Sequence, residues 1–312
     1  MSLLKSKDFL LYKTGATEPT AANGYLTDGY VQLSENPVTF DVNHVGTGKG
    51  NATDTKEVKD NIKITATANI SLFEPVDIAS GMPQFELLQA AGFKQEIDTT
   101  NNKITLYPSL DVEKGTAVYY KGGTMKYLIN GIVSGFGITA SAANTRVVGN
   151  LAMNGAYNPA DLQNVSGVTP TFTETSFFSL TRDSKVIVGG IEKCPFGDIS
   201  LALNPQINTG DDSQVCSDIV LEDIAPTLSF SEVLDATGDS NLVPITNWLN
   251  DSDVTISFML YSKNYKMELK INKGLEKRGE PGESGLKWLQ RRNIRLFDDA
   301  NGRAFELIVT PR

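Results

Sequence analysis

The sequence predicts an all-β protein, and three observations support this. Gly (27 residues) and Pro (13 residues) are spread along the whole chain of 312 residues, so the segments between them are short. Those segments are rich in Val, Ile, Thr, Phe and Tyr, the residues preferred in strands. Several of them alternate apolar and polar residues, which places one face of a strand on a core. Turn residues at short intervals between such segments are typical of β-sandwiches and barrels.

The alternation is clearest in four segments, which we expect to be strands. Two lie in the first half of the chain, at 38–43 and 64–72, and two in the second half, at 199–204 and 254–258. In each segment the apolar side chains share one face and small polar side chains share the other. We therefore expect the apolar faces to be buried and the polar faces to meet solvent or a partner.

Helical pattern is scarce. The best candidate is Pro83–Gly92, where Pro83 suits a first turn, Leu88 and Ala91 share a face, and Gly92 is a plausible stop. Two shorter candidates are Pro244–Asn250 and Leu286–Arg291, which contain Trp248 and Trp288. In such helices we expect both indole rings to pack in the core.

The order strand, polar loop, strand and short helix occurs twice, at an offset of about 160 residues. The paired segments are 38–43 with 199–204, Gly46–Asp60 with Gly210–Asp223, 64–72 with 224–234, and 83–88 with 244–249. We predict two tandem β domains, 1–157 and 176–312, each with one short helix. The segment 158–175, rich in Pro, Asn, Gly, Ser and Thr, would be the linker. Two unrelated β domains with similar strand patterns are the alternative.

Composition and charge argue against several classes of protein. The chain has 28 Lys and Arg against 37 Asp and Glu, a net charge of −9, which argues against binding DNA through its phosphates. No apolar run approaches the roughly 18 residues of a membrane span, and the N-terminal segment has no signal-peptide core. Two cysteines cannot form a disulfide framework, and one histidine cannot build a His-rich metal site. We expect no membrane contact, no metal and no cofactor.

The candidate chemical motifs are incomplete, so no catalytic residue is predicted and we expect the protein not to be an enzyme. His44 has no potential ligand or nucleophile at a suitable spacing. The segment Gly46–Gly50 lacks the spacing and the Ser or Thr of a phosphate-binding loop. Asp211 and Asp212 lack the alternating spacing of a calcium loop. The basic cluster Lys287, Arg291, Arg292 and Arg295 suggests contact with another copy of the chain, or else a solvated helix face.

Five features in a fixed order extend over most of the chain. A long polar loop splits a strand pair (38–43 and 64–72), and a short helix ends in 87–93. Gly-rich strand sequence follows at 132–138, a strand at 147–157 closes the half, and 196–204 opens the second half. None of these motifs is specific alone, but in this order the chain resembles the major tail tube proteins of long-tailed bacteriophages.

The resemblance implies a β-sandwich or partly closed barrel with one flanking helix, which assembles into rings that stack as a hollow tube. Rings of this family present six tube domains, so three chains with two domains each would complete a ring; a homohexamer is the alternative. The implied partners are other copies, the tape-measure, tail terminator and distal tail proteins, and passing genomic DNA that is not bound tightly. The implied location is the virion tail, after assembly in the host cytoplasm. A binding or decoration module of a virion or cell surface is the second hypothesis.

Two sets of functional residues are predicted. The polar strand faces would line the lumen, because a DNA conduit should present few cations; they comprise Thr39, Asp41, Asn43, Thr65, Thr67, Asn69, Ser71, Ser200, Asn204, Thr227, Ser229 and Ser231. The two long polar loops would reach the adjacent ring, through Gly46, Gly48, Lys49, Asp54, Lys56, Gly210, Asp211 and Asp212. The alternatives are solvent-facing positions on an ordinary sandwich and disordered hairpin tips.

Overall fold

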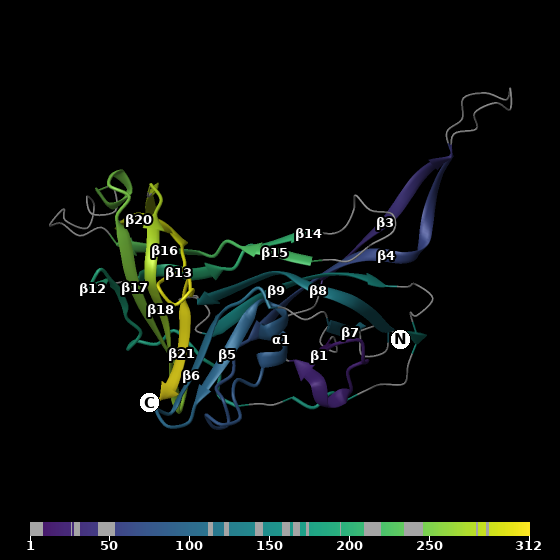
Figure 1. The fold of residues 1–312 in the computed structure, drawn as a ribbon, viewed down its shortest axis with the longest axis horizontal. Coiled ribbons are helices and arrows are strands. Elements are labelled where there is room, and N and C mark those ends of the chain that lie inside the picture. Colours follow the sequence, from purple (N-terminus) through teal and green to yellow (C-terminus); the bar gives the residue numbers. More distant parts are fainter. Residues whose placement is uncertain are drawn as a thin grey trace. The chain divides into compact units, whose positions relative to one another are not determined.

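The computed structural model is mostly strand, which confirms the all-β prediction (Figure 1). It describes residues 9–25, 27, 32–42, 54–111, 115–121, 125–140, 146–157, 163–164, 169–172, 175–193, 195–208, 220–233, 246–278, 280–284 and 287–312. The chain divides into two compact units, unit 1 (1–68, 114–132 and 152–172) and unit 2 (69–113, 133–151 and 173–312). These units interleave along the chain, whereas the predicted domains follow one another. The tandem division stays a prediction.

Three long strands contribute residues to both units: β4 (Asp54–Ser71), β8 (Met125–Ala140) and β9 (Val147–Tyr157). Unit 1 also contains β1 (Phe9–Thr14), a 3-10 turn η2 (Ala21–Asn23), β2 (Gly24–Tyr25), β3 (Gln32–Val42), β7 (Gly115–Lys121) and β10 (Gln163–Asn164). Strands β2, β1, β7 and β8 pair in that order, all antiparallel. Phe9 and Tyr120 stack at 4.5 Å between ring centroids in a small core with Leu11 and Val118.

Unit 2 contains one helix among its described elements, α1 (Phe85–Ala90), and the remaining strands. These are β5 (Phe93–Asp98), β6 (Lys103–Pro108), β11 (Val186–Val188), β12 (Ile191–Lys193), β13 (Pro195–Ala202), β14 (Pro205–Asn208), β15 (Val220–Ile224), β16 (Thr227–Val233), β17 (Asp253–Tyr261), β18 (Tyr265–Glu276), β19 (Glu280–Ser284), β20 (Lys287–Leu296) and β21 (Glu306–Pro311).

Two antiparallel ladders of unit 2 meet at β18. One ladder has the order β12, β11, β17, β18, β21, β6, β5. The other has the order β8, β13, β16, β20, with β19 on the far edge of β20. The end of β18, Gly274–Glu276, pairs with β20, while its first half pairs with β21. In Figure 1 these strands run from green to yellow.

The core of unit 2 follows the alternation in the sequence. Buried and half-buried residues alternate strictly along β16, and the same period recurs in β17 and β18. Phe93 contacts Phe136 and Phe305 edge-on, with ring centroids 5.5 Å and 5.9 Å apart. The predicted helix at 83–92 is confirmed: α1 buries Leu87 and Leu88, and Gly92 follows it with a φ of +94°.

Two helix predictions in the second half have different outcomes. Residues 246–249 form the expected helical turn, in which the N–H of Asn250 donates to the carbonyl of Thr246. Its Trp248 is 39% exposed, so the expectation of a core indole is wrong. The expected turn at 286–291 is also wrong, because β20 begins at Lys287 and contains Trp288. The inward positions of β20 include Gln290 and Arg292, and these polar residues conceal the alternation that would have indicated a strand.

Candidate functional site

A transverse row of small polar side chains crosses four strands of unit 2. Thr139 of β8 lies opposite Ser200 of β13, Ser200 lies opposite Ser229 of β16, and Ser229 lies opposite Asn293 of β20. All four residues are half-buried. Directly opposed residues have Cβ atoms roughly 5 Å apart, so these four side chains form one continuous strip, which we call the polar row.

A second row runs beside the polar row. It consists of Gly137, Ala202, Thr227 and Arg295, again in register from β8 to β20. Asn204 continues beyond β13, and its amide Nδ2 donates to the Thr227 hydroxyl at 3.0 Å and to the Ala225 carbonyl at 3.1 Å. Asn150 of β9 donates in the same way to the Thr139 hydroxyl at 2.8 Å. These bonds fix the orientation of the small polar groups.

The opposite side of the same strands is apolar and buried. Leu201, Leu228 and Ile294 are 3%, 1% and 1% exposed, and Phe230 is 2% exposed. This polarity follows from the two-residue period of the strand, which sends successive side chains to opposite faces. The result is a surface that presents hydroxyl and amide groups, which hydrogen-bond weakly and carry no charge.

Most described members of the predicted lumen set lie on polar strand faces. Ser200, Asn204, Thr227, Ser229 and Ser231 lie on the face of the polar row. Thr65, Thr67 and Asn69 lie on the polar face of β4, while the intervening Ala66 and Ala68 are buried. The structure gives Thr39 and Asp41 a place in β3 without describing their side chains, and Asn43 lies outside the described residues. No orientation toward a channel follows from one chain.

Ser71 is a correction to this set, because it is 1% exposed rather than on a polar surface. Ile70, Ser71 and Leu72 are all buried, so the alternation of β4 stops at its end. The Ser71 hydroxyl accepts a hydrogen bond from Arg146 Nη1 at 3.3 Å, and its carbonyl accepts one from the Gln84 amide at 3.3 Å. These two long side chains cover the end of the strand.

Sequence reasoning missed two members of the polar row and two cations beside it. Thr139 and Asn293 join the row only through strand register, which a single sequence does not reveal. Arg291 and Arg295, both exposed, lie opposite Ser231 and Thr227 on the same face. The expected cation-free surface therefore has a basic margin along β20.

The predicted inter-ring loops are shorter than expected where the structure describes them. Strand β4 begins at Asp54, and Asp54 and Lys56 pair with Val42 and Phe40 of β3, so these two residues are in a strand rather than a loop. In the second half, β14 and β15 form a hairpin that takes up both flanks of the segment. The other predicted loop residues, Gly46, Gly48, Lys49, Gly210, Asp211 and Asp212, lie outside the described residues, as do His44, Cys194 and Cys216.

The predicted basic cluster is divided by burial. Arg292 is 1% exposed and reaches Glu276 of β18 with two hydrogen bonds, from Nε at 2.5 Å and Nη2 at 2.6 Å. Its Nη1 lies 3.6 Å from Glu232 Oε1, and both glutamates are also buried. A bidentate arginine satisfies a carboxylate geometrically, which is how three charged groups are accommodated in a core. Arg292 is therefore an internal residue and not part of a surface patch.

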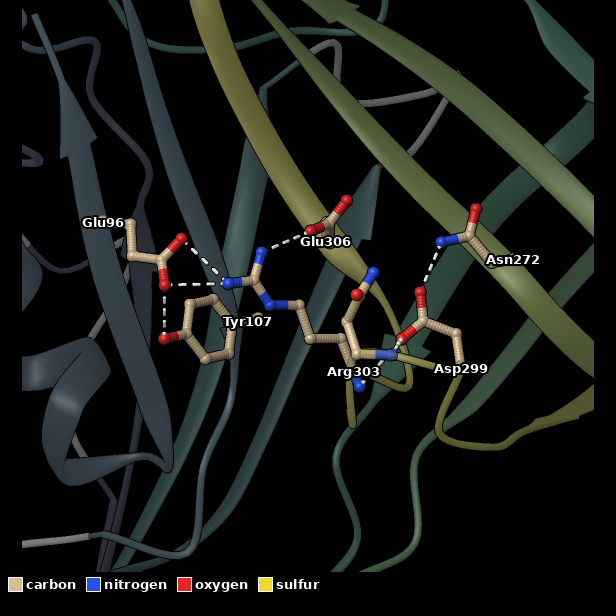
Figure 2. A network of polar contacts seen from close by, with 7 residues as sticks. Glu96, Tyr107, Asn272, Asp299, Arg303 and Glu306 are labelled. Atoms are coloured by element: carbon tan, nitrogen blue, oxygen red, sulfur yellow. Dashed lines mark hydrogen bonds and ion pairs between the residues drawn. The ribbon is translucent and has the colours of Figure 1, made fainter.

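A second charged network joins β5, β6 and β21. Figure 2 shows the Arg303 guanidinium between Glu96 and Glu306, with Asp299 and Asn272 beside it. Arg303 lies 4.0 Å from the Tyr107 ring centroid, and the Tyr107 hydroxyl donates to Glu96 at 2.9 Å. Strands β6 and β21 are paired, so this network reinforces a contact between segments about 200 residues apart.

The network sets the direction of two carboxyl pKa values. Burial alone would raise the pKa of Glu96, but hydrogen bonds from Arg303 and Tyr107 and the charge of Arg303 outweigh it and lower that pKa. For Asp299 burial likewise raises the pKa, and hydrogen bonds from Asn272 and the N–H groups of Asn301 and Arg303 reverse this and lower it. Each group is held as a carboxylate, which suits a structural role.

Within the described residues, no three or more His, Cys, Asp and Glu side chains are arranged to hold a metal ion. In the same ranges, no helix is long and apolar enough to cross a membrane. No protein-family model matches the chain, and a comparison with curated proteins finds no match either.

Proposed function

We propose that this protein is a structural, self-assembling virion protein whose stacked rings form the tail tube of a long-tailed phage. The observation that carries the proposal is the polar row, a strip of short uncharged side chains across four strands above an apolar core. Such a surface offers DNA hydrogen-bonding groups without the cations that would trap it by counterion release. The margin formed by Arg291 and Arg295 weighs against this reading of the bore and makes it testable.

Self-assembly is the second part of the proposal. In the described pairings β5 is hydrogen-bonded on one side only, to β6, so one edge is available. Exposed strand edges pair with other chains unless they are protected. Heterologous contacts that close by rotation form rings, and repetition along an axis forms a tube. Three copies per ring are proposed, with six as the alternative, and the tape-measure, terminator and distal tail proteins would be the partners at the ends of the tube.

Negative-stain electron microscopy of the purified full-length chain tests this function. Rings or tubes with a central channel support it, and separate globular particles at all concentrations contradict it. The second candidate function, a binding or decoration module, is favoured by one observation: Trp248 and Leu249 are 39% and 66% exposed on one helical turn. Separate particles would favour that candidate, because aromatic side chains at the surface commonly mediate recognition.

A further inference from the structure

Two neighbouring apolar side chains project from a firmly held turn of unit 2, and we call Trp248 and Leu249 the Trp248 knob. The turn is closed by the Ser252 N–H, which donates to the Asn247 carbonyl at 2.9 Å. The Asn247 amide donates to Glu276 Oε2 at 3.3 Å, and Glu276 is itself held by Arg292. The exposed pair therefore rests on the buried charged groups, which favours binding because little side-chain freedom remains to be lost.

A cleft of about 580 Å³ lies elsewhere in the same unit. Its apolar walls include Pro108, Leu110, Ile224, Pro226 and Phe297. Leu110 is 54% exposed, so a large part of this lining is open to a partner. The volume is within the roughly 300–1,000 Å³ of pockets that enclose a drug-sized group, which is sufficient for an indole ring. We call this cavity the Leu110 cleft.

The charges near the two features are complementary in part. The Arg278 guanidinium lies 5.8 Å from the Trp248 ring centroid, and its side chain is exposed. The carboxylates of Asp223 and Asp298 belong to the Leu110 cleft. Of the two cations in the cleft, Arg295 lies over the Phe297 ring at 5.1 Å and Lys94 comes from β5. A knob that enters with Arg278 beside it would bring that cation to the acidic side of the cleft.

The knob and the cleft lie toward opposite ends of one strand pair. Leu275 of β18 lies opposite Arg295, and the chain then runs through Glu276 toward Arg278, beside the knob. Strand β20 runs the other way, from Arg295 into Phe297 and Asp298 in the cleft. A contact between such unlike surfaces is heterologous, so it propagates into a ring or a filament rather than stopping at a dimer.

We infer that the Trp248 knob of one copy inserts into the Leu110 cleft of the next copy. This inference rests on the proposed self-assembly and names the contact that would carry it. An exposed tryptophan at the centre of a desolvated pocket is the usual form of an interface hot spot. The occupant is a second copy because the same chain supplies an apolar knob, a cleft of sufficient size and charges of opposite sign.

Cysteine cross-linking between unlike variants tests the contact. In a background carrying Cys194→Ser and Cys216→Ser, one variant carries Leu249→Cys and a second carries Leu110→Cys. We expect a disulfide-linked dimer when the two are mixed and oxidised, and none from either variant alone. A third variant, Val76→Cys, places a thiol at a residue that is 65% exposed outside both features and serves as the matched control.

Absence of the linked dimer in the mixture, or an equal yield when Val76→Cys replaces either variant, would overturn the inference. A Trp248→Ala chain gives a second readout: loss of higher assemblies with an unchanged unfolding midpoint, whereas Ile191→Ala, at a residue 58% exposed elsewhere, leaves assembly intact. If the unmodified chain forms tubes and these variants behave like it, the knob contact is wrong while the proposed function stands. If the unmodified chain never assembles, the proposed function itself fails.

Discussion

Arg292 holds two carboxylates in the interior of unit 2, between β16, β18 and β20. Replacing it with Met would leave Glu276 and Glu232 buried without their cation. Breaking a buried pair in this way costs about 3–5 kcal/mol, so Arg292→Met should lower the free energy of unfolding by that amount. Urea-induced unfolding followed by fluorescence measures the change.

The neighbouring Arg291 provides a control on the same strand. It is exposed and lies on the opposite face, so Arg291→Met should change the free energy of unfolding by no more than about 0.5 kcal/mol. Equal effects of the two substitutions would mean that the buried arrangement of Arg292 is incorrect.

The network around Arg303 predicts an acid-sensitive component of stability. The pKa values of Glu96 and Asp299 lie below their ordinary values of 4.5 and 3.8 in the folded chain, so the unfolded chain binds more protons as the pH falls. The stabilisation is therefore complete above those ordinary values and is lost as the pH decreases through the lower, folded values. Melting temperatures from neutral pH to about pH 3 should show a smaller acid-induced decrease for Glu96→Gln. An unchanged acid limb would contradict this assignment.

At the scale of the element, the two faces of β16 should respond differently to truncation. Phe230 is 2% exposed, and removing a buried Phe side chain costs about 3–5 kcal/mol. Ser229 lies next to it on the opposite face, so Ser229→Ala should change the free energy of unfolding by no more than about 0.5 kcal/mol. Chemical denaturation of Phe230→Ala and Ser229→Ala compares the faces directly; similar losses would show that the strand is not one-sided.

The strands that alternate regularly could be predicted from the sequence, and those with polar residues in the core could not. Strands β16 and β17 and helix α1 were located by period and punctuation, whereas β20 was mistaken for a helical turn because Gln290 and Arg292 point inward. The partners that make this possible, Glu276 and Glu232, lie on other strands, and only the folded chain brings them together.

The candidate site was predictable in part for the same reason. The polar faces around Ser200 and Ser229 follow from alternation within each segment. Thr139, Asn293 and the arginines of β20 join them through the register of long-range pairs, which local pattern does not encode. Ser71 was misplaced because alternation does not continue where Gln84 and Arg146 cover the strand end.

At the scale of the whole molecule, a lumen of uncharged side chains should be sensitive to added cations. Lys in place of Thr67 and Ser229 would attract phosphates, while each site stays on a polar strand face and folding is unaffected. We expect virions with this double substitution to assemble normal tails and to eject their DNA more slowly. Gln at the same positions, which adds bulk without charge, is the control; equal slowing by Gln would exclude an electrostatic cause.

The central claim is that copies of this chain build a hollow tube whose inner surface carries the polar row. Electron cryomicroscopy of assemblies formed by the purified full-length chain tests this directly. The account predicts stacked rings of three copies with Ser200, Ser229 and Asn293 facing an open channel. Isolated particles, or a tube with the polar row on its outer surface, would contradict it.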